Sequence, residues 1–134
     1  LDLKYRTVGQ IARPLSLADT VNVQTPVPEI IRLCADRGHT RLPVWESGQS
    51  HARIAGIVSL KNILYDVSGV TRATAGDYLR PALFLEESQP LEEALRRLQR
   101  SGQPLAIVVD AARRERGFLT LADVLGAVFG EVTL

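Results

Sequence analysis

Two short motifs in the chain combine residue types that can bind a ribose and a phosphate. Residues 56–62 read Gly-Ile-Val-Ser-Leu-Lys-Asn and residues 117–123 read Gly-Phe-Leu-Thr-Leu-Ala-Asp. Each has a glycine, two apolar residues, a hydroxyl and, three residues after the hydroxyl, Asn or Asp. Free backbone N–H groups and the dipole at a helix start attract phosphate, and a carboxylate one turn further on can accept hydrogen bonds from ribose hydroxyls. The motifs therefore predict paired nucleotide sites.

The same pattern also has a purely structural interpretation. Thr120 followed by Asp123 resembles a capping box, which stabilises a helix start by about 1 kcal/mol. Ser59 and Asn62 repeat the arrangement in a weaker form, because an amide carries no charge and is a weaker acceptor than a carboxylate. Both interpretations place the motifs where a strand passes into a helix.

The motifs belong to an internal repeat that extends over most of the chain. Residues 26–44 align without a gap with residues 90–108, at an offset of 64, whereas the motif glycines Gly56 and Gly117 are 61 residues apart. The first copy thus has three extra residues before Gly56, where an exposed hairpin loop is expected to accept them. The chain is therefore predicted to hold two units of about 60 residues rather than an array of short solenoid repeats.

Each unit is predicted to run strand, helix, strand, strand, helix, which gives an α/β (α+β) fold. Proline and glycine mark the helix ends, since Pro favours a first turn and Gly a position just after the last. Two extended segments stopped by proline, residues 11–14 and 78–81, lead into the units. The predicted elements after these segments are a strand at 21–23, helices at 26–37 and 59–67 and strands at 40–45 and 54–58 in the first unit, and helices at 90–101 and 120–129 and strands at 105–109 and 118–119 in the second.

Composition limits the classes of function. The chain has 134 residues, of which 46% are hydrophobic, and a net charge of +1, so it can form a core and has no strong field for nucleic acid or anionic membranes. Cys34 is the only cysteine, no apolar run is long enough to span a bilayer, and no secretory signal is present. No nucleophile, base and oxyanion site is visible, so we expect no enzyme, and no second His stands at metal-ligand spacing from His39. Because the chain begins at Leu1 and lacks Met, we expect it to be part of a longer protein.

The repeat with its two motifs resembles a CBS-domain pair, or Bateman module, and is more closely similar to the cytosolic pair of the CorC/HlyC and CNNM magnesium-transport proteins. The likeness covers nearly the whole chain. The stretches that carry it are residues 5–14, Gly-His-Thr-Arg-Leu-Pro-Val at 38–44, Ala-Ile-Val-Val-Asp at 106–110, and residues 117–125 with Phe129-Gly130-Glu131. It implies two pseudo-symmetric β-α-β-β-α units packed through their sheets, with residues 1–14 as a lead-in linker strand, 15–70 as the first CBS domain and 71–134 as the second.

The resemblance also implies a ligand, an adenosine nucleotide such as ATP or AMP, with or without Mg²⁺, in a cleft between the units. Asp123 would hold the ribose and Thr120 a phosphate, while Ser59 and Asn62 would belong to a second, pseudo-symmetric site. Backbone groups and apolar contacts would line the adenine side of the ligand. The residues expected there are His39, Thr40, Arg41 and Pro43.

Three positions depart from the family pattern. Arg13 stands where the family has Thr, Val or another small residue before the proline, and this arginine could either reach a phosphate or block the site. Asn62 replaces the usual Asp, which weakens the expected first-unit site. Residues 111–116 read Ala-Ala-Arg-Arg-Glu-Arg where acidic residues and glycine are typical, so a basic, solvated turn is expected after Asp110.

The function that the resemblance implies is that of a regulatory module rather than an enzyme. Its setting would be the cytoplasmic part of an inner- or plasma-membrane transporter for magnesium or cobalt, with the membrane domain and a second copy of the module as partners. The helices after the two motifs would form the dimer, and the apolar residues of 121–129 are the candidate face. Two alternatives remain: a ligand-free structural dimerisation module, which Arg13 and Asn62 favour, and a regulatory CBS pair of a metabolic enzyme.

Overall fold

The structure, a computed structural model, describes residues 5–50, 52–66 and 73–129. By its internal contacts the chain divides into two units. We call Asp19–Ala82 the continuous unit, and Leu1–Ala18 with Leu83–Leu134 the split unit. The boundaries inferred from the sequence, after residues 14 and 70, follow the order of the repeats instead and stay a prediction.

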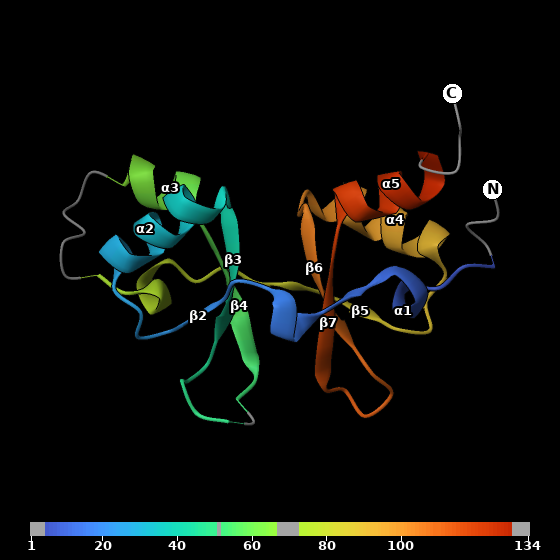
Figure 1. The fold of residues 1–134 in the computed structure, drawn as a ribbon, viewed down its shortest axis with the longest axis horizontal. Coiled ribbons are helices and arrows are strands. Elements are labelled where there is room, and N and C mark those ends of the chain that lie inside the picture. The colour runs from blue at the N-terminus through green and yellow to red at the C-terminus, as the bar shows by residue number, and fades with distance from the viewer. Residues whose placement is uncertain (1–4, 51, 67–72, 130–134) are drawn as a thin grey trace. The chain divides into compact units, whose positions relative to one another are not determined.

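The continuous unit contains a three-stranded sheet in the order β2-β3-β4. Strand β2 is parallel to β3, and β3 is antiparallel to β4 (Figure 1). The predicted order of strand, helix, strand, strand, helix is found. The elements are β2 (Val21–Asn22), α2 (Val27–Arg37), β3 (Arg41–Trp45), β4 (Ile54–Ser59), α3 (Leu60–Tyr65) and the 3-10 helix η2 (Ala75–Tyr78).

Helix α2 begins and ends where its sequence predicts. Pro28 lies in the first turn, where a missing N–H costs nothing, and Gly38 ends the helix at a φ of 73°. The N–H of Gly38 donates to the carbonyl oxygen of Cys34 at 2.8 Å, and the Cys34 side chain lies in the core with Ile30 and Leu42. Cys34 is therefore a core residue.

The split unit contains a four-stranded sheet in the order β1-β7-β6-β5. The central pair β6 and β7 is antiparallel, and β5 lies parallel to β6 at one edge. The elements are α1 (Val8–Ile11), β1 (Arg13–Pro14), the 3-10 helix η1 (Leu15–Leu17), β5 (Leu83–Glu86), α4 (Leu91–Ser101), β6 (Leu105–Val109), β7 (Glu115–Thr120) and α5 (Leu121–Phe129). Each unit combines helices with a sheet, which confirms the predicted mixed α/β fold with two repeats.

The lead-in segment at the N-terminal side packs into the core of the second repeat. Val8 is fully buried in one cluster with Leu85 and Leu91. Two backbone hydrogen bonds of 2.9 Å tie the segments together, from Val8 N to the Gln89 carbonyl and from Leu91 N to the Arg6 carbonyl. Residues 5–14 are therefore an integral part of the split unit.

The second lead-in segment packs into the core of the continuous unit in the same way. Ala75 is fully buried in the cluster that contains Ile30, and Val27 N donates to the Ala73 carbonyl at 3.0 Å. Single bridges link Thr7 with Pro90 and Thr74 with Pro26, so the two contacts are equivalent within the repeat. Each repeat's lead-in segment thus packs on the other repeat.

A few element ends differ from those expected. Helix α3 ends at Tyr65 rather than at Val67, which lies outside the described residues, as do Gly130 and Glu131. Strand β7 begins at Glu115, three residues before the predicted start, because its pairing with β6 continues past a bulge at Val108 and Val109. Within the described ranges, no helix has the length and apolar character that crossing a bilayer requires.

Candidate functional site

Thr120 and Asp123 form a reciprocal capping box at the start of α5. The backbone N–H of Thr120 donates to Asp123 Oδ2 at 2.9 Å, and the backbone N–H of Asp123 donates to Thr120 Oγ1 at 3.0 Å. The structural interpretation of this motif is confirmed. The two bonds also fix both side chains at the point where β7 passes into α5.

The capping box leaves part of the Asp123 carboxylate open. Its Oδ2 atom accepts from Thr120 N and from Arg13, whereas Oδ1 accepts no hydrogen bond in the part of the chain that the structure describes. An ionised carboxylate has about four acceptor positions, and the Asp123 side chain is 23% exposed. Asp123 therefore retains the capacity to accept from two further hydroxyl groups.

Arg13 lies directly against this carboxylate. Strand β1 pairs with β7 so that Arg13 stands opposite Phe118, and Pro14 opposite Gly117. This register puts Arg13 Nη2 at 3.1 Å from Asp123 Oδ2, and the guanidinium carbon at 4.3 Å from the centre of the Phe118 ring. The Arg13 side chain is half exposed and forms an ion pair with the candidate ribose acceptor. Both roles expected for Arg13, a phosphate ligand and a block of the site, stay predictions.

The glycine of each motif is explained by the close approach of a lead-in segment. A Cβ atom on Gly117 would lie 2.8 Å from the Arg13 carbonyl oxygen, and one on Gly56 would clash with the Arg80 carbonyl oxygen. Arg80 bridges to Ile57, as Arg13 does to Phe118. Sequence reasoning found the glycines but missed their role, because the partner segments lie far away along the chain.

In the continuous unit, the equivalent motif lies at the end of β4. Ser59 is buried, stands opposite Arg41 in the strand pair, and makes no side-chain bond that caps α3. The backbone N–H of Leu60 donates instead to the Thr40 carbonyl at 2.8 Å. Asn62 is half buried on the first turn of α3. Thr40, Arg41 and Ser59 are thus brought together at one end of this sheet.

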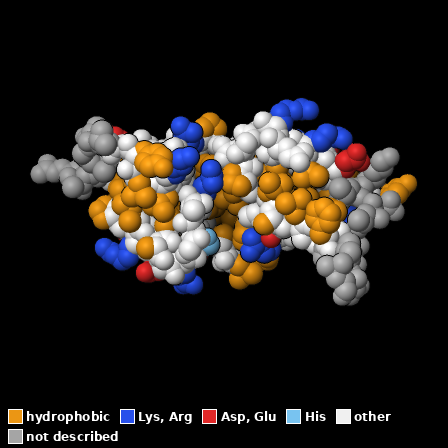
Figure 2. All heavy atoms as spheres, turned by 90° about the horizontal axis from the view of Figure 1, so that it is seen from above, with side chains coloured by type: hydrophobic (Ala, Val, Ile, Leu, Met, Phe, Trp, Pro, Cys, Tyr) orange, Lys and Arg blue, Asp and Glu red, His pale blue; other side chains and the backbone are white. Residues whose placement is uncertain are grey.

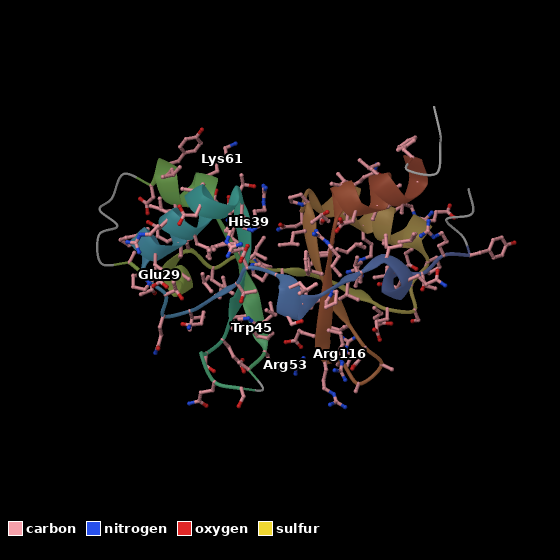
Figure 3. The ribbon with its side chains drawn as sticks, viewed as in Figure 1. Glu29, His39, Trp45, Arg53, Lys61 and Arg116 are labelled. Atoms are coloured by element: carbon pink, nitrogen blue, oxygen red, sulfur yellow. The ribbon has the colours of Figure 1, made fainter. Side chains whose placement is uncertain are left out.

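The remaining predicted residues of this unit occupy different environments. His39 Nε2 lies 2.6 Å from Asp19 Oδ2, so the imidazole has a carboxylate partner at the end of α2 (Figure 3). Pro43 is buried within β3 opposite Ile57. Among the described residues no group of His, Cys, Asp or Glu side chains could hold a metal ion.

The two motifs differ in charge although they are equivalent in position. In the split unit an arginine meets an aromatic ring and a carboxylate, Arg13 with Phe118 and Asp123. At the matching positions of the continuous unit stand Arg80, Ile57 and Asn62, which offer neither a ring nor a carboxylate. The charged cluster is therefore a property of the second motif alone.

The basic turn between β6 and β7 is ordered by Asp110. Its Oδ1 accepts from the backbone N–H groups of Ala112 and Arg114 at 2.9 and 3.0 Å, and its Oδ2 accepts from Arg116 Nε at 2.8 Å. These bonds, that of Arg114 first, lower the pKa of the Asp110 carboxyl group. Arg113, at a φ of 64°, pairs with Glu86 at 3.0 Å. The turn is exposed as expected, but its arginines at 113 and 116 are held in ion pairs.

A shallow hollow lies beside this turn. Its volume is about 300 Å³, and it is lined by Glu86, Glu87, Ser88, Asp110, Ala111 and Arg113. Arg116 marks the hairpin end of β7, away from the end where α5 begins (Figure 3). The hollow is thus separate from Thr120 and Asp123.

The two repeats, each closing on a strand-to-helix motif, define a tandem α/β fold whose family is known. The CBS domain model matches residues 8–69 and 75–130. The chain belongs to the CBS-domain family and carries two copies of the domain.

Curated relatives extend the assignment. The chain is 32% identical over 108 residues to the UPF0053 protein Rv2366c of Mycobacterium tuberculosis, which covers 78% of the chain and 24% of that protein. It is 26% identical over 133 residues to the magnesium and cobalt efflux protein CorC of Escherichia coli, which covers 98% of the chain and 45% of that protein. The chain thus spans less than half the length of these relatives.

Solved structures share the fold. The CBS domain of a bacterial CNNM/CorC family Mg²⁺ transporter in complex with ATP aligns with a TM-score of 0.84 and 24% identity, over 98% of this chain and 92% of that one. CBSX2 in complex with AMP aligns with a TM-score of 0.75 and 26% identity, over 93% of this chain and 97% of that one. The predicted likeness to CBS pairs of CorC and CNNM proteins is confirmed.

Proposed function

We propose that the chain is a regulatory module that binds an adenosine nucleotide and belongs to a CorC-type transporter of divalent cations. The observation that carries this proposal is the Asp123 carboxylate, which the capping box fixes at the start of α5 while its Oδ1 stays open. Asp123 would accept from the ribose hydroxyls, and Thr120 would face a phosphate at the positive end of the α5 dipole. The module itself performs no chemical step.

The residues expected on the adenine side of the ligand belong to the continuous unit. His39, Thr40, Arg41 and Pro43 would contact adenine through backbone groups and apolar surface. Ser59 and Asn62 would form a second and weaker site, because Asn62 lacks the charge of Asp123. Mg²⁺ would accompany ATP as a counter-ion of its phosphates.

The relatives support a proposed setting. CorC of Escherichia coli is a magnesium and cobalt efflux protein, and a CBS domain of similar fold was solved with ATP. We therefore assign the chain to the cytoplasmic side of a membrane transporter, with the membrane domain as its partner. Bound nucleotide would act on transport only through different affinities for two states of the protein.

A second copy of the chain is the other proposed partner, and helix α5 offers the surface. Leu125 is 39% and Phe129 63% exposed, and Leu64 and Tyr65 are exposed on α3. Figure 2 shows apolar side chains among polar ones on the face of the molecule that it views. Two residues expected in this face are not available, since Val124 is fully buried and Leu121 packs against the core of its own unit. The proposed dimer surface therefore rests on Leu125, Val128 and Phe129.

Two observations favour the alternative of a ligand-free dimerisation module. Arg13 already occupies Asp123 Oδ2, and Asn62 leaves the other motif without a carboxylate. A CBS pair within a metabolic enzyme is the remaining alternative. The residues before Leu1 separate the two settings, because membrane spans there support the transporter and a catalytic domain refutes it.

Thermal unfolding with ATP, ADP or AMP, each with and without Mg²⁺, tests the ligand. A nucleotide at about 100 times its Kd adds roughly 2.7 kcal/mol of stability, a rise in Tm of roughly 5–15 °C for a chain of this length. The shift should disappear in Asp123→Ala when each variant is compared with its own ligand-free Tm. No shift with any nucleotide at millimolar concentration would refute the proposal and leave the dimerisation module.

The chain contains a matched control for the lost cap. Thr74 and Asp77 form another capping box, in which Thr74 N donates to Asp77 Oδ2 at 2.8 Å. Asp77→Ala removes a capping carboxylate of the same geometry from a motif that is assigned no ligand. This variant should lose stability but keep the full nucleotide shift.

A further inference from the structure

Arg13 is held at a fixed place beside the proposed ribose acceptor. Its guanidinium lies over the Phe118 ring at 4.3 Å, and its Nη2 donates to Asp123 Oδ2 at 3.1 Å. Ring stacking and an ion pair from two directions restrict a side chain that would otherwise rotate freely. The cation is thus organised in advance of any ligand.

The guanidinium keeps most of its donors for another partner. An arginine has five N–H donors in a planar fork, and Asp123 is the polar side-chain partner of Arg13 within the described ranges. About half of the side chain is exposed. The free donors can therefore bind a phosphate oxygen, for which the planar fork is well matched.

The charge of Asp123 makes such a cation necessary. A nucleotide that places its ribose on Asp123 brings its phosphates close to a carboxylate, and the repulsion grows with each phosphate charge. Arg13 neutralises the carboxylate at 3.1 Å, so the pair presents no net charge to the ligand. An uncharged nucleoside gains nothing from this neutralisation and competes with Arg13 for the carboxylate.

Resting on the nucleotide-binding function proposed above, we infer that Arg13 makes this site select its ligand by phosphate charge. Arg13 supplies the counter-charge that lets a polyanionic nucleotide bind at Asp123. The dependence on Arg13 increases from adenosine through AMP and ADP to ATP. The residue is therefore a specificity determinant of the proposed site rather than a block of it.

The continuous unit provides the matched control within the same chain. Arg80 takes the place of Arg13 in the repeat, since it bridges to Ile57 as Arg13 pairs with Phe118. Arg80 is exposed, and Asn62 stands where the split unit has Asp123. Arg80→Ala removes the same charge from an equivalent position without a carboxylate.

The test is a calorimetric titration of the parent chain, Arg13→Ala, Arg13→Lys and Arg80→Ala with adenosine, AMP, ADP and ATP in Mg²⁺-free buffer. For Arg13→Ala we expect ATP affinity to fall about 10-fold to 100-fold, as for a lost hydrogen bond between charged groups, with smaller losses for ADP and AMP. Adenosine should bind equally well or more tightly. Arg13→Lys should recover part of the ATP affinity, and Arg80→Ala should match the parent.

The outcomes separate this inference from the function on which it rests. If the parent binds no ligand, the proposed function fails and the role of Arg13 fails with it. If the parent binds but Arg13→Ala weakens all four ligands equally, Arg13 only supports the fold and the inference is wrong. If Arg13→Ala binds all four ligands more tightly than the parent, Arg13 blocks the site and the inference is wrong. If Arg80→Ala loses as much ATP affinity as Arg13→Ala, the effect comes from the net charge of the chain, and the inference is again wrong.

Discussion

The backbone carbonyl oxygen of Arg13 lies 2.8 Å from the position that a Cβ atom would take on Gly117. Any side chain at residue 117 would push β1 away from β7 and with it the guanidinium that reaches Asp123. Gly56 stands in the same relation to Arg80. The first residue of each motif must therefore be glycine for the backbone of the partner segment to approach this closely. This glycine stands three residues before the hydroxyl that was expected to carry the chemistry.

Replacing either glycine should destabilise the chain. We expect Gly117→Ala to lower the free energy of unfolding by about 1–3 kcal/mol, because the backbone must shift to admit the methyl group. Gly56→Ala should cost at least as much, since its closest contact is shorter. Urea unfolding followed by circular dichroism measures both.

A third glycine provides the control for this series. A Cβ atom on Gly126 would meet nothing within 4 Å, and the residue lies inside α5. Gly126→Ala should stabilise the chain by about 0.5–1 kcal/mol through a lower backbone entropy of the unfolded state. A neutral Gly117→Ala would contradict the close pairing of β1 with β7.

Asp110 should make the stability of the chain sensitive to acid. Its pKa in the folded chain is lowered by hydrogen bonds from Arg114, Arg116 and Ala112, whereas an unfolded carboxyl group has a pKa of about 3.9. A lowered folded pKa stabilises the fold above the unfolded value, and the contribution is lost as the pH falls from that value through the folded pKa. Asp110→Asn should therefore be less stable at pH 7 and lose less stability in acid.

Urea midpoints between pH 7 and pH 2.5 measure this difference. Asp36→Asn is the control, because Asp36 is exposed on α2. The difference in urea midpoint between the parent chain and Asp110→Asn should narrow as the pH falls. The difference in urea midpoint between the parent chain and Asp36→Asn should stay small at every pH. Parallel pH profiles for the parent and Asp110→Asn would refute the role of this carboxylate.

Tyr78 should retain its proton in alkaline solution. Its hydroxyl donates to Asp66 Oδ2 at 2.6 Å, and this bond, with partial desolvation, raises the pKa of Tyr78 to about 12. An unfolded tyrosine has a pKa of about 10. The stabilising contribution is therefore fully present below about pH 10 and is lost as the pH rises from 10 to about 12.

Phenolate absorbance after a rapid pH jump tests this assignment. The titration of the folded parent should contain a step near pH 12, which Tyr78→Phe should lack. Tyr65→Phe, a substitution of an exposed tyrosine, should keep it. Persistence of the step in Tyr78→Phe would show that another group produces it.

The proposed dimer predicts a change of mass on a single substitution. Leu125→Glu places a charge on the exposed side of α5 and should give monomers in sedimentation velocity experiments, because a carboxylate in an apolar interface is strongly disfavoured. Leu17→Glu changes an even more exposed leucine outside α5 and should leave the dimer intact. Unchanged dimers in Leu125→Glu would rule out this interface.

Local elements could be predicted from the sequence because local residues determine them. Helix α4 was expected over 90–101 and spans Leu91–Ser101, since Pro90 precedes its apolar stripe and Gly102 follows it at a φ of 68°. The capping box of Thr120 and Asp123 depends on residues three apart and was likewise predictable. In both cases the deciding interactions lie within one or two turns of the chain.

Contacts between distant segments were not predictable in the same way. The bond between Arg13 and Asp123 joins residues 110 apart and exists only because β1 takes a particular register on β7. Helix α5 shows a related limit, because Asp123 is its only charged residue and its apolar pattern does not single out one face. Val124 was thus expected at a dimer surface but is buried in its own unit.

Because each repeat's lead-in segment packs on the other repeat, the order of synthesis limits when each segment can be buried. A ribosome completes residues 19–82, all the parts of the continuous unit, before the first residue of β5 is added. Val8 has by then already been synthesised, but its burial depends on Leu85 and Leu91. The apolar surface of this segment therefore stays exposed until Leu85 and Leu91 have been made. Residues of this segment are thus made before the continuous unit but reach their buried positions only after it is complete.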